Sequence, residues 1–166
     1  AYPVLLTAGD HALLQAEIVD EFCANAAALN ARQAHDFIIG LVPYGLVRSA
    51  WPQSQRTVLR FSDGQFCGSN LFAVLTPAGL QALAFWRQAE TNRKRPWRIA
   101  RHFGLWAMLR YLLRRLSLPA AMASLSEAAG CRVGWVEVEH ARAAVDVDSV
   151  QDQQLADKIL SCEGQK

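Results

Sequence analysis

The chain has 166 residues with a formal net charge of +2, and 52% of them are hydrophobic and 19% charged. This length and apolar content exclude a disordered chain and predict one domain, residues 1–166, with its own hydrophobic core. Four scattered cysteines without a CxxC pair, and no apolar run long enough for a membrane span, exclude a disulfide frame and a membrane-spanning protein and make a cytoplasmic location the expectation.

The first part of the chain has the pattern of a strand, a helix and a second strand. Residues 2–7 form a continuous apolar run, which predicts a fully buried strand. Apolar residues then recur at helical spacing from residue 16 to about residue 30, and residues 37–42 form another apolar run. A strand, a helix and a strand of these lengths predict a βαβ unit and hence a parallel sheet.

A hairpin and four helices are expected in the rest of the chain. Segments 55–61 and 65–74 are strand-like, and Ser62-Asp63-Gly64 between them is a good hairpin turn. Thr76 and Pro77 suit the start of a helix to about residue 91, because threonine caps helices and proline fits their first turn. The remaining expected elements are a helix at 96–116, a short helix at 119–130, strands at 132–138 and 144–147, and a helix at 149–160 capped by Ser149.

Acidic residues follow the first and last of these strands. Asp10 comes directly after the run at 2–7, while Asp146 and Asp148 lie in or beside the strand at 144–147, where a period of two would point them to one face. Ligands of α/β sheets collect at the carboxyl ends of strands, and two carboxylates from separate strands suit Mg²⁺. On spacing alone the favoured interpretation is different: Asp10 caps the following turn and Asp148 the last helix.

Three segments resemble motifs of a known family. Residues 5–14, Leu-Leu-Thr-Ala-Gly-Asp-His-Ala-Leu-Leu, resemble the metal-binding Gly-Asp-x-Pro-Leu-Leu segment of MobA-like nucleotidyltransferases, which belong to the glycosyltransferase-A-like superfamily. Residues 146–152, Asp-Val-Asp-Ser-Val-Gln-Asp, resemble the closing Asp-Ile-Asp-Thr-Pro-Glu-Asp segment of that family. Residues 68–72, Gly-Ser-Asn-Leu-Phe, are similar to the stretch that lines the acceptor pocket in relatives.

The resemblance implies both a fold and a reaction. The fold would be nucleotide-diphospho-sugar transferase-like, an α/β three-layer sandwich with a mostly parallel mixed sheet. Asp10 and Asp148 would be the catalytic residues and would hold Mg²⁺ or Mn²⁺, with Asp146 as the second choice of ligand from the last segment. Gly68 and Asn70 would contact the acceptor. The partners would be a nucleoside triphosphate and a small phosphorylated or hydroxylated acceptor, which attacks the α-phosphorus and expels pyrophosphate.

The sequence departs from the family pattern in three places. Ala12 replaces the proline of the first motif, and Val150-Gln151 replaces the Pro-Glu of the last. Nothing matches the strand and basic, glycine-rich loop with which the family begins and which cradles the nucleotide. The resemblance therefore covers only the later part of the family's domain, and we interpret the chain as that C-terminal part, without the N-terminal strand-loop-helix.

Basic residues are concentrated in one block. Nine of the 17 lie between Arg87 and Arg115, where Glu90 is the only acid. Lys94 and Arg95, in the densest cluster, could bind an acceptor phosphate, or the cluster is a solvated turn between helices. We expect no nucleic-acid partner, because no helix-turn-helix, RNA-binding or zinc-finger pattern accompanies the block.

Two other functions stay open. The chain could be a non-catalytic binding or interaction module with the same fold. It could also be a membrane-surface accessory protein, because the helical stretch 98–116 joins an apolar stripe to arginines, as helices on anionic membranes do. The same stripe would let a helix cover a sheet, which is the interpretation we favour for it. The oligomeric state is not indicated.

Overall fold

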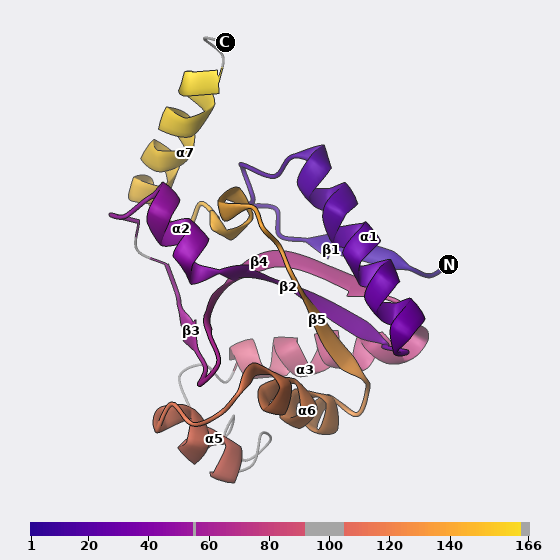
Figure 1. Ribbon diagram of the computed structural model, residues 1–166. Coiled ribbons are helices and arrows are strands. Elements are labelled where there is room, and N and C mark those ends of the chain that lie inside the picture. The colour runs from indigo at the N-terminus through magenta and orange to yellow at the C-terminus, as the bar shows by residue number, and fades with distance from the viewer. Residues whose placement is uncertain (55, 92–104, 164–166) are drawn as a thin grey trace.

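The computed structural model describes residues 1–54, 56–91 and 105–163. Within these residues the protein is a mixed α/β fold in which helices cover both faces of a five-stranded sheet (Figure 1). The strands are β1 (Val4–Thr7), β2 (Phe37–Pro43), β3 (Leu59–Arg60), β4 (Gln65–Val74) and β5 (Val133–Glu137). They follow the order β1-β4-β2-β5, and β3 pairs with β4.

The helices divide between the two faces of the sheet. The α-helices are α1 (Ala16–Arg32), α2 (Tyr44–Ala50), α3 (Leu80–Thr91), α5 (Leu105–Leu112), α6 (Leu118–Ala129) and α7 (Val150–Glu163), and two short 3-10 helices are η1 (Pro77–Gly79) and η2 (Ala141–Ala144). Helix α1 lies on one face, and α3 and α6 lie on the other (Figure 1). None of the described helices is long and apolar enough to cross a membrane.

Strand β2 contributes side chains to a hydrophobic cluster on each face of the sheet, because its side chains alternate between the two faces. Ile38 and Val42 pack with Phe22 of α1 in one cluster. Phe37, Ile39 and Leu41 belong to the other cluster, which contains Met122 and Leu125 of α6. A fully apolar strand is therefore required at this position, as the apolar run at 37–42 predicts.

The prediction of a mostly parallel sheet is wrong. Only β2 and β5 pair in parallel, while β4 is antiparallel to β1, β2 and β3. The chain returns from the β3–β4 turn along β4, which inserts between β1 and β2. Strands β1 and β2 consequently run in the same direction, as a βαβ unit requires, but they are not neighbours.

The prediction of a buried first strand is also wrong. Val4 is 38% exposed and Leu5 is 37% exposed. Strand β1 pairs with β4 along one edge, and no other described strand pairs with its second edge. The apolar run thus forms an edge strand whose side chains are only partly covered.

The predicted strand at 144–147 is absent from the described structure. After β5 the chain forms η2 and then an irregular segment, in which Ala143, Ala144 and Val145 are buried. Helix α2 was not predicted. The hairpin prediction is confirmed, since Leu59 pairs with Phe66 across the expected turn, although β3 is shorter than the expected strand and Gln55 lies outside the described residues.

The helix starts predicted at residues 119 and 149 are confirmed to within one residue, the cap predicted at Thr76 is wrong, and the cap of α6 at Ser117 was not predicted. The Ser117 hydroxyl accepts from the backbone N–H of Ala120 at the start of α6, and Gly130 ends this helix with a positive φ of 70°. The Ser149 hydroxyl accepts from the N–H of Asp152 and caps α7. Thr76 makes no cap hydrogen bond, and its hydroxyl instead donates to Asp36.

The interpretation of the stripe at 98–116 as a cover for the sheet is wrong for its middle part. Leu116 is buried, but Trp106, Leu109 and Leu113 are 70%, 45% and 57% exposed. The earlier stripe residues Ile99 and Phe103 lie outside the described residues.

Candidate functional site

A cavity of about 420 Å³ lies beside the carboxyl end of β2 and the first half of β4. Of the residues that the sequence singles out, Gly68, Asn70, Asp146 and Asp148 all line it. They come from two segments far apart in the chain. The tertiary structure therefore brings the acceptor-like motif and the last acidic motif to one place.

A bulge in β4 positions Asn70. Ile39 pairs with Phe72 and Leu41 with Gly68, so β4 carries extra residues between these two pairs. The fully buried Ser69 stabilises the bulge, because its hydroxyl donates to the carbonyl of Gly40 at 2.8 Å and accepts from the N–H of Leu71. Bulges of this kind re-aim side chains next to active sites.

Two residue types are required at this bulge. Glycine is required at position 40, because a Cβ there would collide with the Ser69 hydroxyl. Asn70 has a φ of 54°, a left-handed conformation that asparagine tolerates better than most residues. The sequence Gly68-Ser69-Asn70 thus presents a half-buried amide side chain at the cavity wall.

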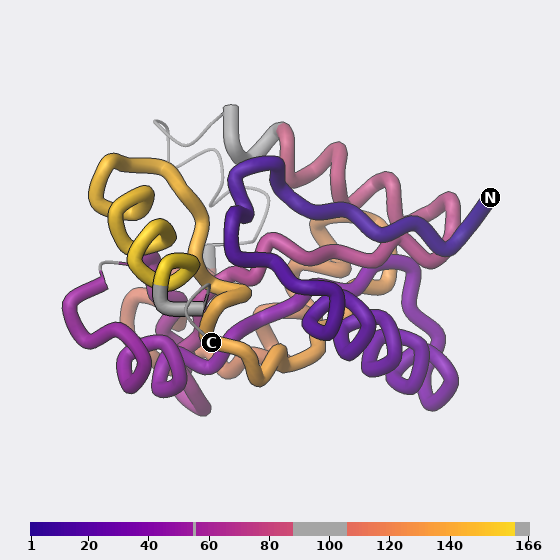
Figure 2. The backbone as a smooth tube through the Cα atoms, turned by 90° about the horizontal axis from the view of Figure 1, so that it is seen from above, coloured from indigo at the N-terminus to yellow at the C-terminus, as the bar shows by residue number. Residues whose placement is uncertain are grey.

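The loop after β1 lies against the segment that carries the last acidic motif. The carbonyl of Asp10 accepts hydrogen bonds from the N–H of Ala12 at 3.0 Å and from the N–H of Val147 at 3.1 Å. Figure 2 shows the loop after β1 next to the chain that leads into α7. Val147 stands between Asp146 and Asp148, so the Asp10 backbone is fixed next to both acids. The side chain of Asp10 is exposed and is outside the set that lines the cavity.

Arg56 is a site residue that the sequence did not indicate. Its side chain is only 6% exposed and lines the cavity. One terminal nitrogen lies 2.6 Å from the carboxylate of Asp146, the other lies 2.6 Å from the carboxylate of Asp152, and Nε donates to the hydroxyl of Ser54. Since these acids follow Arg56 by 90 and 96 positions, no local pattern in the sequence could have revealed the pairing.

The two acids of the last motif have different surroundings. Asp146 is partly buried and neutralised by Arg56, which also donates to its backbone carbonyl. Asp148 is exposed, and within the described part of the chain its carboxylate has no hydrogen-bond or ion-pair partner. Asp148 is therefore the more available of the two for a cation.

His11 lies beneath this acidic region. His11 is 8% exposed, and neither ring nitrogen makes a hydrogen bond of good geometry in the described structure. Burial lowers the pKa of His11, against the opposing effect of the Arg142 and Ala143 backbone and of the Asp146 and Asp10 carboxylates. His11 is buried in a packed position, which makes it a support for the loop more than a base open to a substrate.

Two further parts of the predicted site concern the metal and the basic cluster. No three His, Cys, Asp or Glu side chains among the described residues are grouped so that they could hold a metal ion. Lys94 and Arg95 lie outside the described residues.

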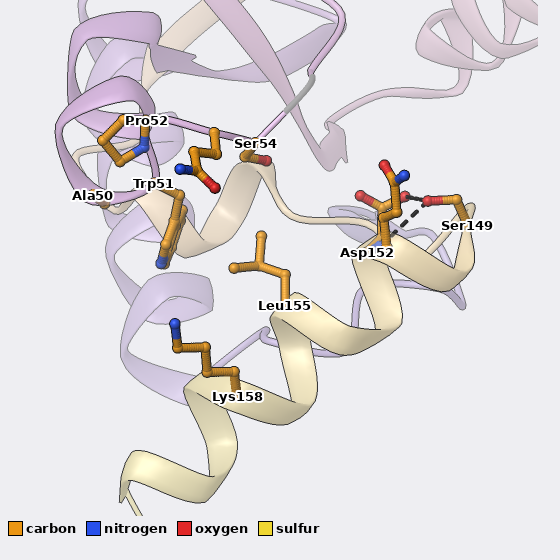
Figure 3. Close-up of a pocket in the computed structure, with 10 residues that line it drawn as sticks. Ala50, Trp51, Pro52, Ser54, Ser149, Asp152, Leu155 and Lys158 are labelled. Atoms are coloured by element: carbon orange, nitrogen blue, oxygen red, sulfur yellow. Dashed lines mark hydrogen bonds between the residues drawn. The ribbon is translucent and has the colours of Figure 1, made fainter.

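A second cavity, of about 760 Å³, lies between the end of α2 with the segment that follows it and helix α7. Figure 3 shows the Leu155 and Lys158 side chains of α7 on the side of the cavity that faces Trp51. Asp152 lines both cavities, and its carboxylate accepts from the Ser149 hydroxyl as well as from Arg56. Asp152 therefore borders both cavities, while its partner Arg56 lines only the first.

Comparisons with known proteins give one structural similarity. No family model and no curated protein matches the chain. A solved structure described as a hypothetical transferase from Thermus thermophilus superposes with a TM-score of 0.75 at 29% sequence identity. The match covers 90% of this chain and 62% of that one, so this chain spans less than two thirds of the length of its neighbour. The mixed α/β fold is thus shared with a transferase-like protein.

Proposed function

We propose that this chain carries the acceptor and metal residues of a magnesium-dependent nucleotidyltransferase. In the reaction, an oxygen of a small phosphorylated or hydroxylated acceptor forms a bond to the α-phosphorus of a nucleoside triphosphate. The bond from that phosphorus to the bridging oxygen breaks, and pyrophosphate leaves. The proposal includes the three-layer sandwich of nucleotide-diphospho-sugar transferases as the parent fold, and the transferase-like neighbour supports it at the level of the fold.

The single observation that carries the proposal is the contact between Asp10 and Val147. Its 3.1 Å hydrogen bond joins the two acidic motifs that would have to share a cation. The motifs begin and end the region of resemblance, and either motif taken alone is explained as well by helix and turn capping. Their meeting in space is what supports a common chemical role.

The donor set fits Mg²⁺ or Mn²⁺ better than a metal that needs a full protein cage. Asp10 and Asp148 are exposed carboxylates from separate segments, and Mg²⁺ is usually bound by one or two carboxylates, water and substrate phosphates. We assign the cation to Asp10 and Asp148, because Asp146 is already paired with Arg56. When bound, the cation would neutralise charge on the phosphates, which together with positioning accounts for most catalysis in phosphoryl transfer.

The chain's own residues would bind and orient the acceptor. The Asn70 amide at the cavity wall can both donate to and accept from a hydroxyl or phosphate. The Arg56 guanidinium could grip a phosphate with two hydrogen bonds at once if it exchanged one of its carboxylate partners. The second cavity would accommodate the part of the acceptor that extends past the Arg56–Asp152 ion pair.

Thermal unfolding with and without MgCl₂ or MnCl₂ tests the metal assignment. We expect either salt to raise the melting temperature, and Asp10→Ala and Asp148→Ala to abolish the rise. Asp20→Ala, an exposed acid on α1, is the matched control and should keep it. An unchanged melting curve of the natural protein, or a rise that survives both site variants, would contradict the assignment.

A pyrophosphate-release assay tests the reaction itself. The protein should release pyrophosphate when a nucleoside triphosphate and an acceptor are supplied together. Asn70→Ala is expected to raise the KM for the acceptor about tenfold, as the loss of one hydrogen bond to a charged group would. If the metal raised the melting temperature but no pyrophosphate were released with ATP, GTP, CTP or UTP, a non-catalytic binding module would be favoured.

A further inference from the structure

Helix α5 is attached to the rest of the protein along one side. The Tyr111 ring packs edge-on against Phe61 after β3, with 5.9 Å between ring centroids. Beyond the helix, the N–H of Ser62 donates to the carbonyl of Leu116, and the Asp63 carboxylate accepts from the N–H of Leu118. The β3–β4 turn therefore fixes the orientation of α5, which lies at the outer edge of the molecule in Figure 1.

The side of α5 opposite Tyr111 is apolar and exposed. Trp106, Leu109, Leu112 and Leu113 are 70%, 45%, 67% and 57% exposed. Their spacing of three, three and one residues places them on one face of the helix and its C-terminal turn. A contiguous exposed apolar face of this kind marks a surface that meets a partner or a membrane.

Arginines border this face. Arg110, Arg114 and Arg115 are exposed, and Arg110 donates to the carbonyl of Arg115, which holds the C-terminal turn together. The sequence contains no aspartate or glutamate from residue 91 to residue 126. Asp63, which approaches from the β3–β4 turn, is already bonded to the backbone of Leu118. The border of the apolar face is thus positively charged.

We propose that α5 and the turn Leu113–Arg115 bind the surface of a bilayer that contains anionic lipid. Trp106 and the leucines would enter the boundary between head groups and acyl chains, where tryptophan is enriched, and the arginines would pair with lipid phosphates. An anionic bilayer offers an apolar region to the exposed apolar face and phosphates to the arginines that border it. A wholly apolar protein surface would leave these arginines without a counter-charge. This surface acts independently of the proposed transfer reaction.

Vesicle co-sedimentation of the whole protein tests the proposal. We expect binding to vesicles of phosphatidylcholine mixed with phosphatidylserine, little binding to phosphatidylcholine alone, and release as salt shortens the range of the attraction. Replacing Arg110, Arg114 and Arg115 together by glutamine should weaken partitioning roughly a hundredfold, at about fivefold for each arginine. Trp106→Ser with Leu112→Ser should weaken it to a similar extent and leave the circular dichroism unchanged.

A matched control uses exposed apolar residues elsewhere. Val150 and Leu160 on α7 are 70% and 46% exposed, and Val150→Ser with Leu160→Ser should leave vesicle binding as it is in the natural protein. Equal binding to neutral vesicles, absence of binding to anionic vesicles, or retention of binding by the α5 variants would overturn the proposal. A change of oligomeric state in the Trp106→Ser, Leu112→Ser protein without lipid would also overturn it, because the face would then meet another protein chain.

Discussion

The Arg56 guanidinium lies 2.6 Å from the carboxylate of Asp146 and 2.6 Å from that of Asp152, and it is almost entirely buried. The pair to Asp152 joins the segment after α2 to helix α7, and the pair to Asp146 fixes the segment that leads into that helix. The buried Arg56 side chain therefore holds the C-terminal acidic motif in place beside the cavity.

Removing the Arg56 guanidinium should destabilise the folded protein. Arg56→Ala leaves two carboxylates without a counter-charge, and we expect the free energy of unfolding to fall by about 3 kcal/mol. Arg60→Ala is the matched control, because Arg60 is exposed and its side chain bonds to the exposed Gln65, and it should change stability by less than about 0.5 kcal/mol. Urea unfolding measures both, and equal midpoints for the two variants would refute the role of Arg56.

The close contact of Gly40 with Ser69 predicts a non-additive pair of substitutions. Gly40→Ala should cost about 1–3 kcal/mol, since the new methyl group meets the Ser69 hydroxyl and also presses on Phe22 and Val138. Ser69→Ala alone should cost about 1 kcal/mol for the lost hydrogen bond. The double variant should be more stable than the sum of the two, because the hydroxyl that causes the main collision is gone. Strict additivity in urea unfolding would contradict this packing.

Asn70 allows its conformational and chemical roles to be separated. Asn70→Gly suits the φ of 54° and should keep the stability within a few tenths of a kcal/mol, whereas Asn70→Val should cost about 1–2 kcal/mol. Under the proposed function, both variants should lose affinity for the acceptor. If Asn70→Gly were folded and bound the acceptor normally, Asn70 would have only a backbone role.

Asp36 predicts a specific dependence of stability on pH. The Arg132 guanidinium and backbone N–H and the Thr76 hydroxyl hold the pKa of Asp36 well below its usual value, against the effect of burial. Because the folded state favours the carboxylate, its contribution is complete above the unfolded pKa of about 4 and is lost as the pH falls below it.

Urea unfolding at neutral pH and at about pH 3 checks this dependence. Asp36→Asn should already be less stable at neutral pH and should lose less on acidification than the natural protein. Asp20→Asn, which changes an exposed acid, should lose as much as the natural protein. An equal acid loss in Asp36→Asn and the natural protein would show that other carboxylates carry the effect.

Several predicted site residues lie far apart in the sequence, and the sequence does not show whether they meet in space. Gly68, Asn70, Asp146 and Asp148 were chosen from separate motifs, and the fold places all four around one cavity. Gly68 and Asn70 came from the resemblance alone, whereas Asp146 and Asp148 were expected to share a face because of a period of two along a strand at 144–147, which the structure does not form. Asp146 and Asp148 instead lie in an irregular segment after η2, in which the N–H of Val147 donates to the carbonyl of Asp10.

The sequence by itself determined the features that arise within a few residues of each other: the cap at Ser149, the helix that ends at Gly130, the hairpin and the apolar run of β2. These depend on local backbone geometry and on side-chain periodicity. Only the tertiary structure decided that β4 separates β1 from β2, that β1 is an edge strand, that Arg56 meets Asp146, and that the stripe of α5 faces outward. Each of these depends on which distant segments come together, and a burial pattern looks the same in sequence whether its partner is a strand, a helix or a surface outside the chain.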